Sequence, residues 1–584
     1  MSDVFVENSV CGSVWKVKES DERIIQAMMQ RFQLPEMVAR LLVARGVALD
    51  DVESFLNPTL RKNLADPFSL KDMQKAAERM VESIIKKEPI GIMGDYDVDG
   101  ATSSAVLKMF LKHCGITVLT FIPDREDGYG PNAKKMHEFK EKGCTVVATL
   151  DCGMTAFEAI QEGTDCGLDV IVLDHHDPEK KLPNAYAVVN PKRLDEPLDH
   201  PCRYMAAVGV VFLFTIAVNK ILREKGFYQT IPEPNLISFL DLVALGTVCD
   251  VVKLQGINRL FVRSGLKQMS KGENIGINAL SELTGLSQPP TAYHLGFVFG
   301  PRINACGRVG QSDIGMKLLS CEDKAEATIL AQQLEELNLY RREVESVVLL
   351  DAIEQLEKNP LDTPFVLAQG ENWHQGVVGI VAGRLKDKYN LPSFVLSIEG
   401  DEVKGSSRSV TGVDLGTLIM NALQQGILSR GGGHPMAAGF SLKKDKIPDF
   451  IAYLKEHIQL PPSCQHHVIE ADGILNISAI NPELIQEIEC IAPFGEGNAE
   501  PKFILKDVML SHVVLLKNGH IGCTFSGKTG RSISGIAFRC ADNELGQALM
   551  TGQNKYVHVL GILRQDKYPK RNSLQIQIQD LAFV

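Results

Sequence analysis

The chain has 584 residues, 45% of them hydrophobic and 23% charged, and a formal net charge of −11. This length is too great for one hydrophobic core and predicts about three or four domains, and the acidic balance argues against a general nucleic-acid coat protein without excluding local basic grooves. No apolar run is long enough to cross a bilayer, and residues 1–20 lack the apolar core of a signal peptide, so we expect no membrane partner. The 13 cysteines are scattered and show no metal-finger spacing, which predicts reduced thiols and a cytoplasmic protein.

Residues 1–75 are predicted to form a polar, helical N-terminal region. From residue 76 to about 320, short apolar runs alternate with helical stretches such as 101–113 and 132–142. The expected strands are 90–94, 117–123, 145–150, 170–173 and 185–190. This alternation predicts an α/β domain with a parallel, doubly wound sheet, whose ligands would lie beyond the carboxyl ends of the strands.

Three further regions follow along the chain. Within 321–360, the stretch 322–358 has no Gly or Pro and carries an apolar stripe, which predicts one long connecting helix; two helices with a kink are the alternative. A second, smaller α/β domain is expected at 361–460. After the linker QLPPSC, residues 465–584 alternate β-like runs with Gly- and Asn-containing turns, which predicts a small β-barrel.

Acidic side chains cluster around the ends of the predicted strands. The clusters are Asp95, Asp97 and Asp99 in GDYDVDGATSSA, Asp151 in VVATLDCGMT, Asp174, His175 and His176 in VIVLDHHDP, and Asp250 after an apolar helix-like run. Carboxylates this close repel one another unless cations neutralise them. Together with an imidazole they predict a site for two divalent cations, Mn²⁺ or Mg²⁺, suited to two-metal phosphoryl hydrolysis. For any single position the alternative is a turn residue or helix N-cap.

The motifs DYDVDG, DCG, LDHHDP and ALGTVCDVV, in this order, resemble those of the DHH phosphoesterase superfamily. GPRINACGRVG, WHQGVVGIVAGRL, KGSSRSV and GGGHPMAAG resemble the rest of one branch, the RecJ single-stranded-DNA exonucleases, and IAPFGEGNAEPKF resembles the entry into their OB-fold. The resemblance covers about residues 70–584. It implies a DHH catalytic domain at 76–320, a DHHA1 domain at 361–460 and an OB-fold nucleic-acid-binding domain at 465–584.

The resemblance also implies residue roles. The metal ligands would be Asp95, Asp97, Asp99, Asp151, His175 and Asp250, with Asp151 as the bridge between the ions. The catalytic set would comprise Asp151, His176 beside the scissile phosphate and Asp174, which would orient the histidines. The expected substrate contacts are Arg125, Arg302, Asn304, Arg308, Ser406, Ser407, Arg408, Gly432, Gly433 and His434. Among these, Ser406 and Arg408 are the main candidates for a 5′-phosphate pocket, and the consecutive glycines could form an anion nest.

The implied function is a metal-dependent 5′→3′ exonuclease that degrades single-stranded DNA to 5′-mononucleotides in DNA repair and recombination. Single-strand-binding protein and a helicase would be its partners, and a cleft between the DHH and DHHA1 domains that admits one strand would exclude a duplex. One alternative is a DHH-family phosphodiesterase for short oligonucleotides or cyclic dinucleotides, although such chains usually lack the OB-like part. The non-enzymatic alternative is an inactive replication or repair scaffold, against which the intact acidic clusters count.

Overall fold

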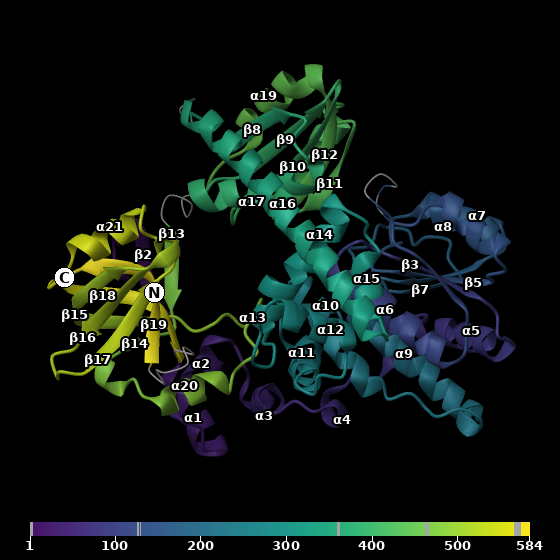
Figure 1. The fold of residues 1–584 in the computed structure, drawn as a ribbon, viewed down its shortest axis with the longest axis horizontal. Coiled ribbons are helices and arrows are strands. Elements are labelled where there is room, and N and C mark those ends of the chain that lie inside the picture. The colour runs from purple at the N-terminus through teal and green to yellow at the C-terminus, as the bar shows by residue number, and fades with distance from the viewer. Residues whose placement is uncertain (1–3, 125–127, 129, 359–361, 462–466, 566–573) are drawn as a thin grey trace. The chain divides into compact units, whose positions relative to one another are not determined.

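The protein folds into two compact units, seen in a computed structural model that describes residues 4–124, 128, 130–358, 362–461, 467–565 and 574–584 (Figure 1). The first unit comprises Ser20–Asn338 and Glu483–Pro501. The second unit comprises Met1–Glu19, Leu339–Pro482 and Lys502–Val584. No helix in the described ranges is long and apolar enough to cross a membrane.

A five-stranded parallel sheet forms the centre of the first unit. Its order is β4-β3-β5-β6-β7, with the strands β3 (Ile90–Gly94), β4 (Val118–Phe121), β5 (Val146–Leu150), β6 (Asp169–Leu173) and β7 (Ala187–Val189). Val146 and Ala148 pack in the larger hydrophobic core on one face, whereas Val147 packs in a smaller core on the other, as expected for a sheet buried on both faces. The five expected strands and the doubly wound sheet are therefore confirmed.

Helices cover both faces of this sheet. One face carries α5 (Met73–Lys86), α6 (Val98–His113) and α9 (Ala207–Glu224), and the other carries α7 (Ala133–Glu141) and α8 (Phe157–Asp165). The remaining helices of this unit include α1 (Glu22–Phe32), α2 (Glu36–Ala44), α3 (Val52–Leu56), α4 (Leu60–Asn63), α10 (Leu240–Cys249), α11 (Gly256–Met269), α12 (Ile275–Leu283), α13 (Ala292–His294), α14 (Gly300–Val309) and α15 (Ile314–Leu319).

The expected long helix is a single element, α16 (Lys324–Lys358). The Asp323 carboxyl accepts a hydrogen bond from the Glu326 N–H at 2.8 Å and caps its first turn. Leu330 and Leu334 pack into the core of the first unit, and the helix then continues into the second unit. The absence of Gly and Pro along its length explains why no kink interrupts it.

The second unit contains a five-stranded mixed sheet and a barrel. The sheet order is β11-β12-β10-β9-β8, with β8 (Val366–Glu371), β9 (Ser393–Glu399), β10 (Glu402–Arg408), β11 (Arg430–His434) and β12 (Ala437–Lys443), accompanied by α17 (Gln375–Tyr389), α18 (Leu415–Gln424) and α19 (Ile447–His457). The barrel contains β14 (Gly473–Leu475), β15 (Phe503–Leu515), β16 (Ile521–Ser526), β17 (Ser532–Ala537), β18 (Tyr556–Gln565), β19 (Leu574–Phe583) and α21 (Glu544–Thr551). Pairing of β15 with β18 closes it, so the predicted β-barrel is confirmed.

The start of the chain differs from the prediction. Residues 1–75 were expected to be helical, but β1 (Val4–Val6) and β2 (Ser13–Val17) form a small sheet with β13 (His467–Ala471), and the first helix begins only at Glu22. The short runs VFV and SVWKV carry β-branched and aromatic residues that favour strands. Trp15 is fully buried, because this sheet packs against the barrel. The partner strand lies more than 400 residues away, so local sequence could not predict the pairing.

Asp580 connects these N-terminal strands to the barrel. Its carboxyl group is fully buried and accepts hydrogen bonds from Ser9 Oγ at 2.6 Å and Trp15 Nε1 at 2.9 Å. We expect Asp580→Ala to lower the free energy of unfolding of the second unit by about 2–4 kcal/mol, since buried donors lose their acceptor. Denaturant unfolding followed by tryptophan fluorescence would measure this. Asp542→Ala, at an exposed position next to α21, is the control, and equal losses for both variants would contradict the prediction.

The segment Glu483–Pro501 interrupts the region 465–584 that was expected to form the barrel domain, because it belongs to the first unit. The Arg259 guanidinium donates to the Ala492 carbonyl at 2.8 Å, and Arg45 Nε donates to Asn498 Oδ1 at 2.7 Å, so this segment packs within the first unit. Helix α20 (Pro482–Glu489) lies at its start. A deletion from residue 465 onward would therefore remove part of the first unit together with the barrel.

Candidate metal centre

Three aspartates lie at the carboxyl ends of neighbouring strands in the first unit. The Asp95 N–H donates to the Leu150 carbonyl at 3.3 Å and the Asp151 N–H donates to the Leu173 carbonyl at 3.0 Å, which extends the ladder one residue beyond β3 and β5. Asp174 follows β6 in the same way. The strand order reverses between β3 and β5, and ligands of open α/β sheets bind at such a point.

The aspartate loop after β3 leads directly into α6. Asp97 is the N-cap of this helix and accepts from the Gly100 N–H at 3.1 Å. A Cβ at Gly100 would lie 2.3 Å from the Asp95 carbonyl oxygen, so the tight turn requires glycine there. Asp99 lies in the first turn of α6, and its carboxyl accepts from the first two N–H groups of α9 at 2.6 and 2.9 Å. The N-terminus of α9 thus stabilises negative charge on Asp99.

His175 connects the aspartates from different elements. Its Nε2 lies 3.3 Å from Asp151 Oδ1, 3.6 Å from Asp250 Oδ2 and 3.9 Å from Asp99 Oδ2. Asp250 is the C-cap of α10, so a helix end contributes to the set as well as the strand ends. Both Asp151 and His175 are buried.

The donor atoms form three overlapping groups, each with its atoms within 4.8 Å of one another: Asp95, Asp97 and Asp151; Asp99, His175 and Asp250; Asp151, His175 and His176. All six predicted metal ligands occur in these groups. Asp151 belongs to two of them, as a bridging ligand would. Carboxylate oxygens with one or two imidazoles suit Mg²⁺ or Mn²⁺.

The electrostatics of the cluster also fit bound cations. Burial, followed by repulsion from neighbouring aspartates, raises the pKa of Asp95, Asp151 and Asp250 well above the usual range, and raises the pKa of Asp99 to about 7. Asp95 Oδ1, Asp151 Oδ1 and Asp250 Oδ2 are buried and accept no hydrogen bond from the described residues. Without a cation such oxygens are costly to bury, so the residues fit a divalent-metal site.

The backbone is strained beside the same ligands. Asp151 has φ 60° and Val251, next to Asp250, has φ 58°. A β-branched residue with positive φ is a rare outlier that the surrounding structure must enforce. Strain of this kind clusters at functional sites, which agrees with the position of both residues.

Asp174 forms a hydrogen-bonded pair with His176, which belongs to one of the donor groups. Asp174 Oδ1 accepts from the His176 ring Nδ1 at 2.7 Å and from the main-chain N–H groups of His175 and His176. Burial opposes a charged imidazole, but the hydrogen bond and charge of Asp174 outweigh it and raise the pKa of His176 to about 9. Burial also opposes a charged carboxyl group, but the hydrogen bond and charge of His176 outweigh it and lower the pKa of Asp174 to about 2. At neutral pH the pair in the metal-free protein is therefore imidazolium and carboxylate.

We expect Asp174→Asn to lower the pKa of His176 by about 1–3 pH units in the metal-free protein, because the opposite charge is removed. The two shifts mean that the pair stabilises the fold fully between the ordinary pKa values of 3.8 for Asp174 and 6.5 for His176. This contribution is lost as the pH rises through about 9 or falls through about 2. An NMR titration of histidine-labelled protein in chelator would measure the change. Asp177→Asn is the control, and a pKa of His176 unchanged by Asp174→Asn would contradict the assignment.

The expected substrate contacts in the first unit have protein partners. Arg302 pairs with Glu335 at 2.5 Å and donates to the Val298 carbonyl, and Asn304 Oδ1 accepts from the Val98 N–H at 3.1 Å, which holds the aspartate loop. Arg308 is partly buried at the end of α14. Their contacts with substrate stay a prediction, and Arg125 lies outside the described residues.

In the second unit, strand pairing brings Ser406, Arg408 and His434 to one face of the sheet. Ser406 pairs with Gly439, which pairs with Gly432, and Arg408 pairs with Ala437, which pairs with His434. Directly paired residues share a face. A Cβ at Gly432 or Gly439 would meet nothing within 4 Å, so the sheet is open beside the Ser406 hydroxyl.

Arg408 has an unusual environment on this face. Its Nη1 donates to the Ser407 carbonyl at 2.9 Å and to Ser406 Oγ at 3.3 Å, and no described carboxylate forms an ion pair with it. Burial lowers the pKa of its guanidinium. A partly buried cation without a carboxylate is suited to an anionic ligand, and Arg favours bidentate contact with phosphate.

Ser407 and Gly433 lie on the opposite face of the sheet. They pair through Ala438, and the buried Ser407 hydroxyl donates to the Ala438 carbonyl at 3.2 Å. The glycine motif is the edge strand β11, in which no glycine has a positive φ, and this corrects the expectation of an anion nest. The alternation of side chains along paired strands explains why neighbours in the sequence separate in this way.

Comparisons with known proteins agree with this architecture. Models of the DHH family N-terminal domain, the DHHA1 domain and the RecJ OB domain match residues 89–247, 362–460 and 471–580. The single-stranded-DNA-specific exonuclease RecJ of Bacillus subtilis is 32% identical over 97% of this chain and 70% of its own length. Escherichia coli RecJ is 34% identical over 81% of this chain and 83% of its own. The chain belongs to the RecJ family.

Solved RecJ structures share the fold. The Thermus thermophilus protein in complex with Mn²⁺ has a TM-score of 0.80 and 27% identity, covering 97% of this chain and 79% of that one. The same protein in complex with Mg²⁺ has a TM-score of 0.75, with 26% identity over 98% of this chain and 78% of that one. The likeness extends over both units of the present RecJ-family chain.

Sequence reasoning missed several groups that position this RecJ-family site. The Asn190 side chain donates to the His176 carbonyl at 2.9 Å, and the Met154 N–H donates to Asp174 Oδ2 at 3.0 Å. Asn190 follows β7, so its place at the end of a strand was a usable signal. The N–H groups from Met154 and from α9 are main-chain donors, which no sequence motif marks.

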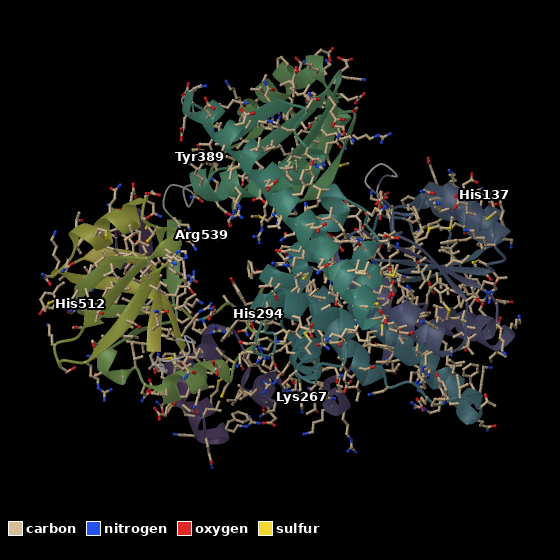
Figure 2. The ribbon with its side chains drawn as sticks, in the orientation of Figure 1. His137, Lys267, His294, Tyr389, His512 and Arg539 are labelled. Atoms are coloured by element: carbon tan, nitrogen blue, oxygen red, sulfur yellow. The ribbon has the colours of Figure 1, made fainter. Side chains whose placement is uncertain are left out.

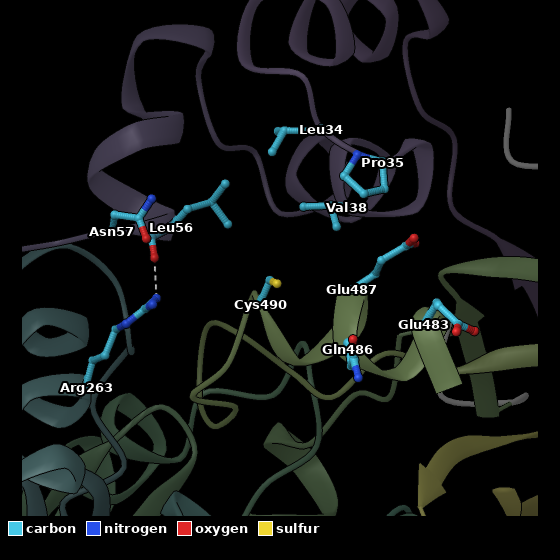
Figure 3. A pocket seen from close by; sticks show the side chains of 10 residues that line it. All are labelled: Leu34, Pro35, Val38, Leu56, Asn57, Arg263, Glu483, Gln486, Glu487 and Cys490. Carbon is cyan, nitrogen blue, oxygen red and sulfur yellow. Dashed lines mark hydrogen bonds between the residues drawn. The ribbon is translucent and has the colours of Figure 1, made fainter. Parts of the chain in front are cut away.

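A cavity of about 440 Å³ lies elsewhere in the first unit, lined by α2, α20 and Arg263 of α11 (Figure 3). Arg263 donates to the Leu56 carbonyl at one end of it. Val38 and Leu56 give the cavity an apolar lining, and no predicted site residue contributes to it. The candidate active site of this RecJ-family chain is therefore the carboxylate cluster and not this cavity.

Proposed function

We propose that this protein is a metal-dependent exonuclease that hydrolyses single-stranded DNA from the 5′ end and releases 5′-mononucleotides. The observation that carries the proposal is the convergence of the six predicted ligand side chains near the point where the strand order reverses, with buried carboxyl oxygens that accept no hydrogen bond from the described residues. The RecJ relatives of Bacillus subtilis and Escherichia coli are named as single-stranded-DNA-specific exonucleases, and this supports the choice of substrate.

Two divalent cations, Mn²⁺ or Mg²⁺, fit the donor groups. Asp95, Asp97 and Asp151 would hold one ion, and Asp99, His175 and Asp250 would hold the other, with Asp151 close enough to serve both. Such a pair, when bound, supplies a nucleophile at neutral pH and neutralises charge on the phosphoryl oxygens. The Thermus relative was crystallised with each of these metals, which supports the assignment.

The protein's own residues position the substrate. His176, held by its hydrogen bond to Asp174, would place an imidazole donor beside the carboxylates, where a phosphate oxygen of the strand would be stabilised. On the second unit, Ser406, Arg408 and His434 would hold the terminal 5′-phosphate. Recognition of that phosphate would give the enzyme its polarity.

The barrel would hold the trailing strand by stacking and charge, as OB-folds do. We place the enzyme in the cytoplasm, in DNA repair and recombination, where single-strand-binding protein and a helicase would supply the opened strand. Association with these two partners rests on the resemblance of the chain to RecJ exonucleases.

Purified protein with Mn²⁺ and labelled oligonucleotides tests the function. A 5′-labelled single strand should release labelled mononucleotide at the earliest times, a 3′-labelled strand should shorten as a ladder, and a blunt duplex should persist. Chelator should stop both reactions. Faster cutting of cyclic dinucleotides or of two- to three-residue fragments would instead identify a phosphodiesterase, and binding of single strands without cutting would identify a scaffold.

A further inference from the structure

Two large aromatic side chains of the first unit lie exposed and stacked on one another. The exposed fraction is 54% for Tyr293 and 68% for Phe297, with ring centroids 5.1 Å apart and an interplanar angle of 27°. Tyr293 belongs to α13, and Phe297 belongs to the π-helical turn η5 (Leu295–Phe299) that follows (the neighbouring His294 is labelled in Figure 2). Leaving two such rings in water forgoes the hydrophobic stabilisation that burial would give.

The turn that carries the rings is firmly held. Leu295 and Phe299 are fully buried, so η5 is anchored on both sides of the outward-pointing Phe297. Thr291 and His294 form a capping box at the start of α13. The rings therefore project from an ordered element, and single π-helical turns occur frequently at functional sites.

The same element packs beside one of the proposed metal ligands. The Cys249 thiol donates to the Leu295 carbonyl at 3.4 Å, and a Cβ at Gly300 would lie 2.7 Å from the Cys249 sulfur, so η5 packs against the end of α10. The next residue of the chain is Asp250, whose carboxyl lies in the cluster. Helix α14, which continues from η5, carries Asn304, the residue that holds the aspartate loop. The aromatic pair therefore belongs to a segment that packs against the residue next to Asp250 and continues into the helix that holds the aspartate loop.

We propose that Tyr293 and Phe297 form a stacking platform for a nucleobase of the single-stranded substrate near the metal centre. The inference rests on the proposed function and adds a base-binding site to it. Aromatic side chains bind single strands by stacking on the π-face of any base, which requires no particular sequence. In a duplex both faces of each internal base are already stacked, so the platform would favour an unpaired strand.

Binding to metal-free protein separates this site from the chemistry. With a fluorescent single strand in chelator, Phe297→Ala should raise the dissociation constant about five- to a hundredfold, the range for loss of one base stack. Phe297→Trp should bind as the wild type does, whereas Phe297→Leu should resemble Phe297→Ala because an aliphatic side chain cannot stack. Ile237→Ala, at another exposed apolar position of the unit, is the control and should change nothing.

An abasic scan then tests whether a base is the occupant. Replacing one nucleotide at a time by an abasic residue should reveal a position where wild-type binding weakens as much as it does in Phe297→Ala, with no further loss when the two changes are combined. Normal binding by Phe297→Ala, full binding by Phe297→Leu, or additive losses at every abasic position would each overturn the platform. Failure of the wild type to bind single strands would instead count against the proposed function.

Discussion

Asp151→Asn should reduce hydrolysis of a single strand in Mn²⁺ by about a thousandfold or more, because Asp151 belongs to two of the three donor groups and the metals supply several kcal/mol of charge stabilisation. Asn keeps the size of the side chain and tolerates the left-handed backbone at φ 60° better than Ala would. The metal-free variant should be as stable as the wild type or more so. Burial and the charges of four neighbouring aspartates raise the pKa of Asp151, so neutralising it relieves both.

Turnover in saturating Mn²⁺ and thermal unfolding in chelator would measure the two effects. Asp241→Asn is a matched control, since Asp241 is a buried carboxyl on α10 with a pKa of about 7 that belongs to none of the donor groups. It should retain activity within a few-fold. Near-normal turnover by Asp151→Asn would rule out a shared ligand, and a large loss of stability in chelator would mean that Asp151 has a structural role.

Arg408→Ala should reduce kcat/KM on 5′-phosphorylated strands about ten- to a hundredfold, with a much smaller effect on 5′-hydroxyl strands. The guanidinium is partly buried without an ion-pair partner among the described carboxylates, and it lies on the same face as Ser406 and His434. A charge-assisted hydrogen bond to the terminal phosphate would contribute about 1.5–3 kcal/mol, which corresponds to this range.

Steady-state kinetics on the two strands would give the ratio directly. Arg408→Lys should recover part of the preference, because a lysine keeps the charge but loses the planar fork. Lys443→Ala, on the same sheet but paired with Glu402, should leave the ratio unchanged. If Arg408→Ala lowered kcat/KM equally on the 5′-phosphorylated and 5′-hydroxyl strands, Arg408 would contact another part of the substrate or stabilise the fold.

The sequence alone predicted the elements whose signals are local. Short apolar runs that end in aspartate predicted β3, β5 and β6 within one or two residues, because parallel strands buried on both faces are continuously apolar and their ends are polar. The long helix α16 followed from an uninterrupted stretch without Gly or Pro. The gathering of Asp95, Asp151 and Asp174 was predictable for the same reason, since carboxylates at the ends of neighbouring parallel strands must lie at one rim.

Only the tertiary structure decided which side chains face each other. Ser406 and Ser407 are adjacent in the sequence, yet one faces the open side of the sheet and the other is buried, because pairing of β10 with β12 fixes the face of each residue. Residues 4–17 form strands because β13 and the barrel provide their partners. The raised pKa of Asp151 likewise depends on burial and on aspartates from other elements. Contacts between residues far apart in the chain have no local signal, so folding alone brings these groups together.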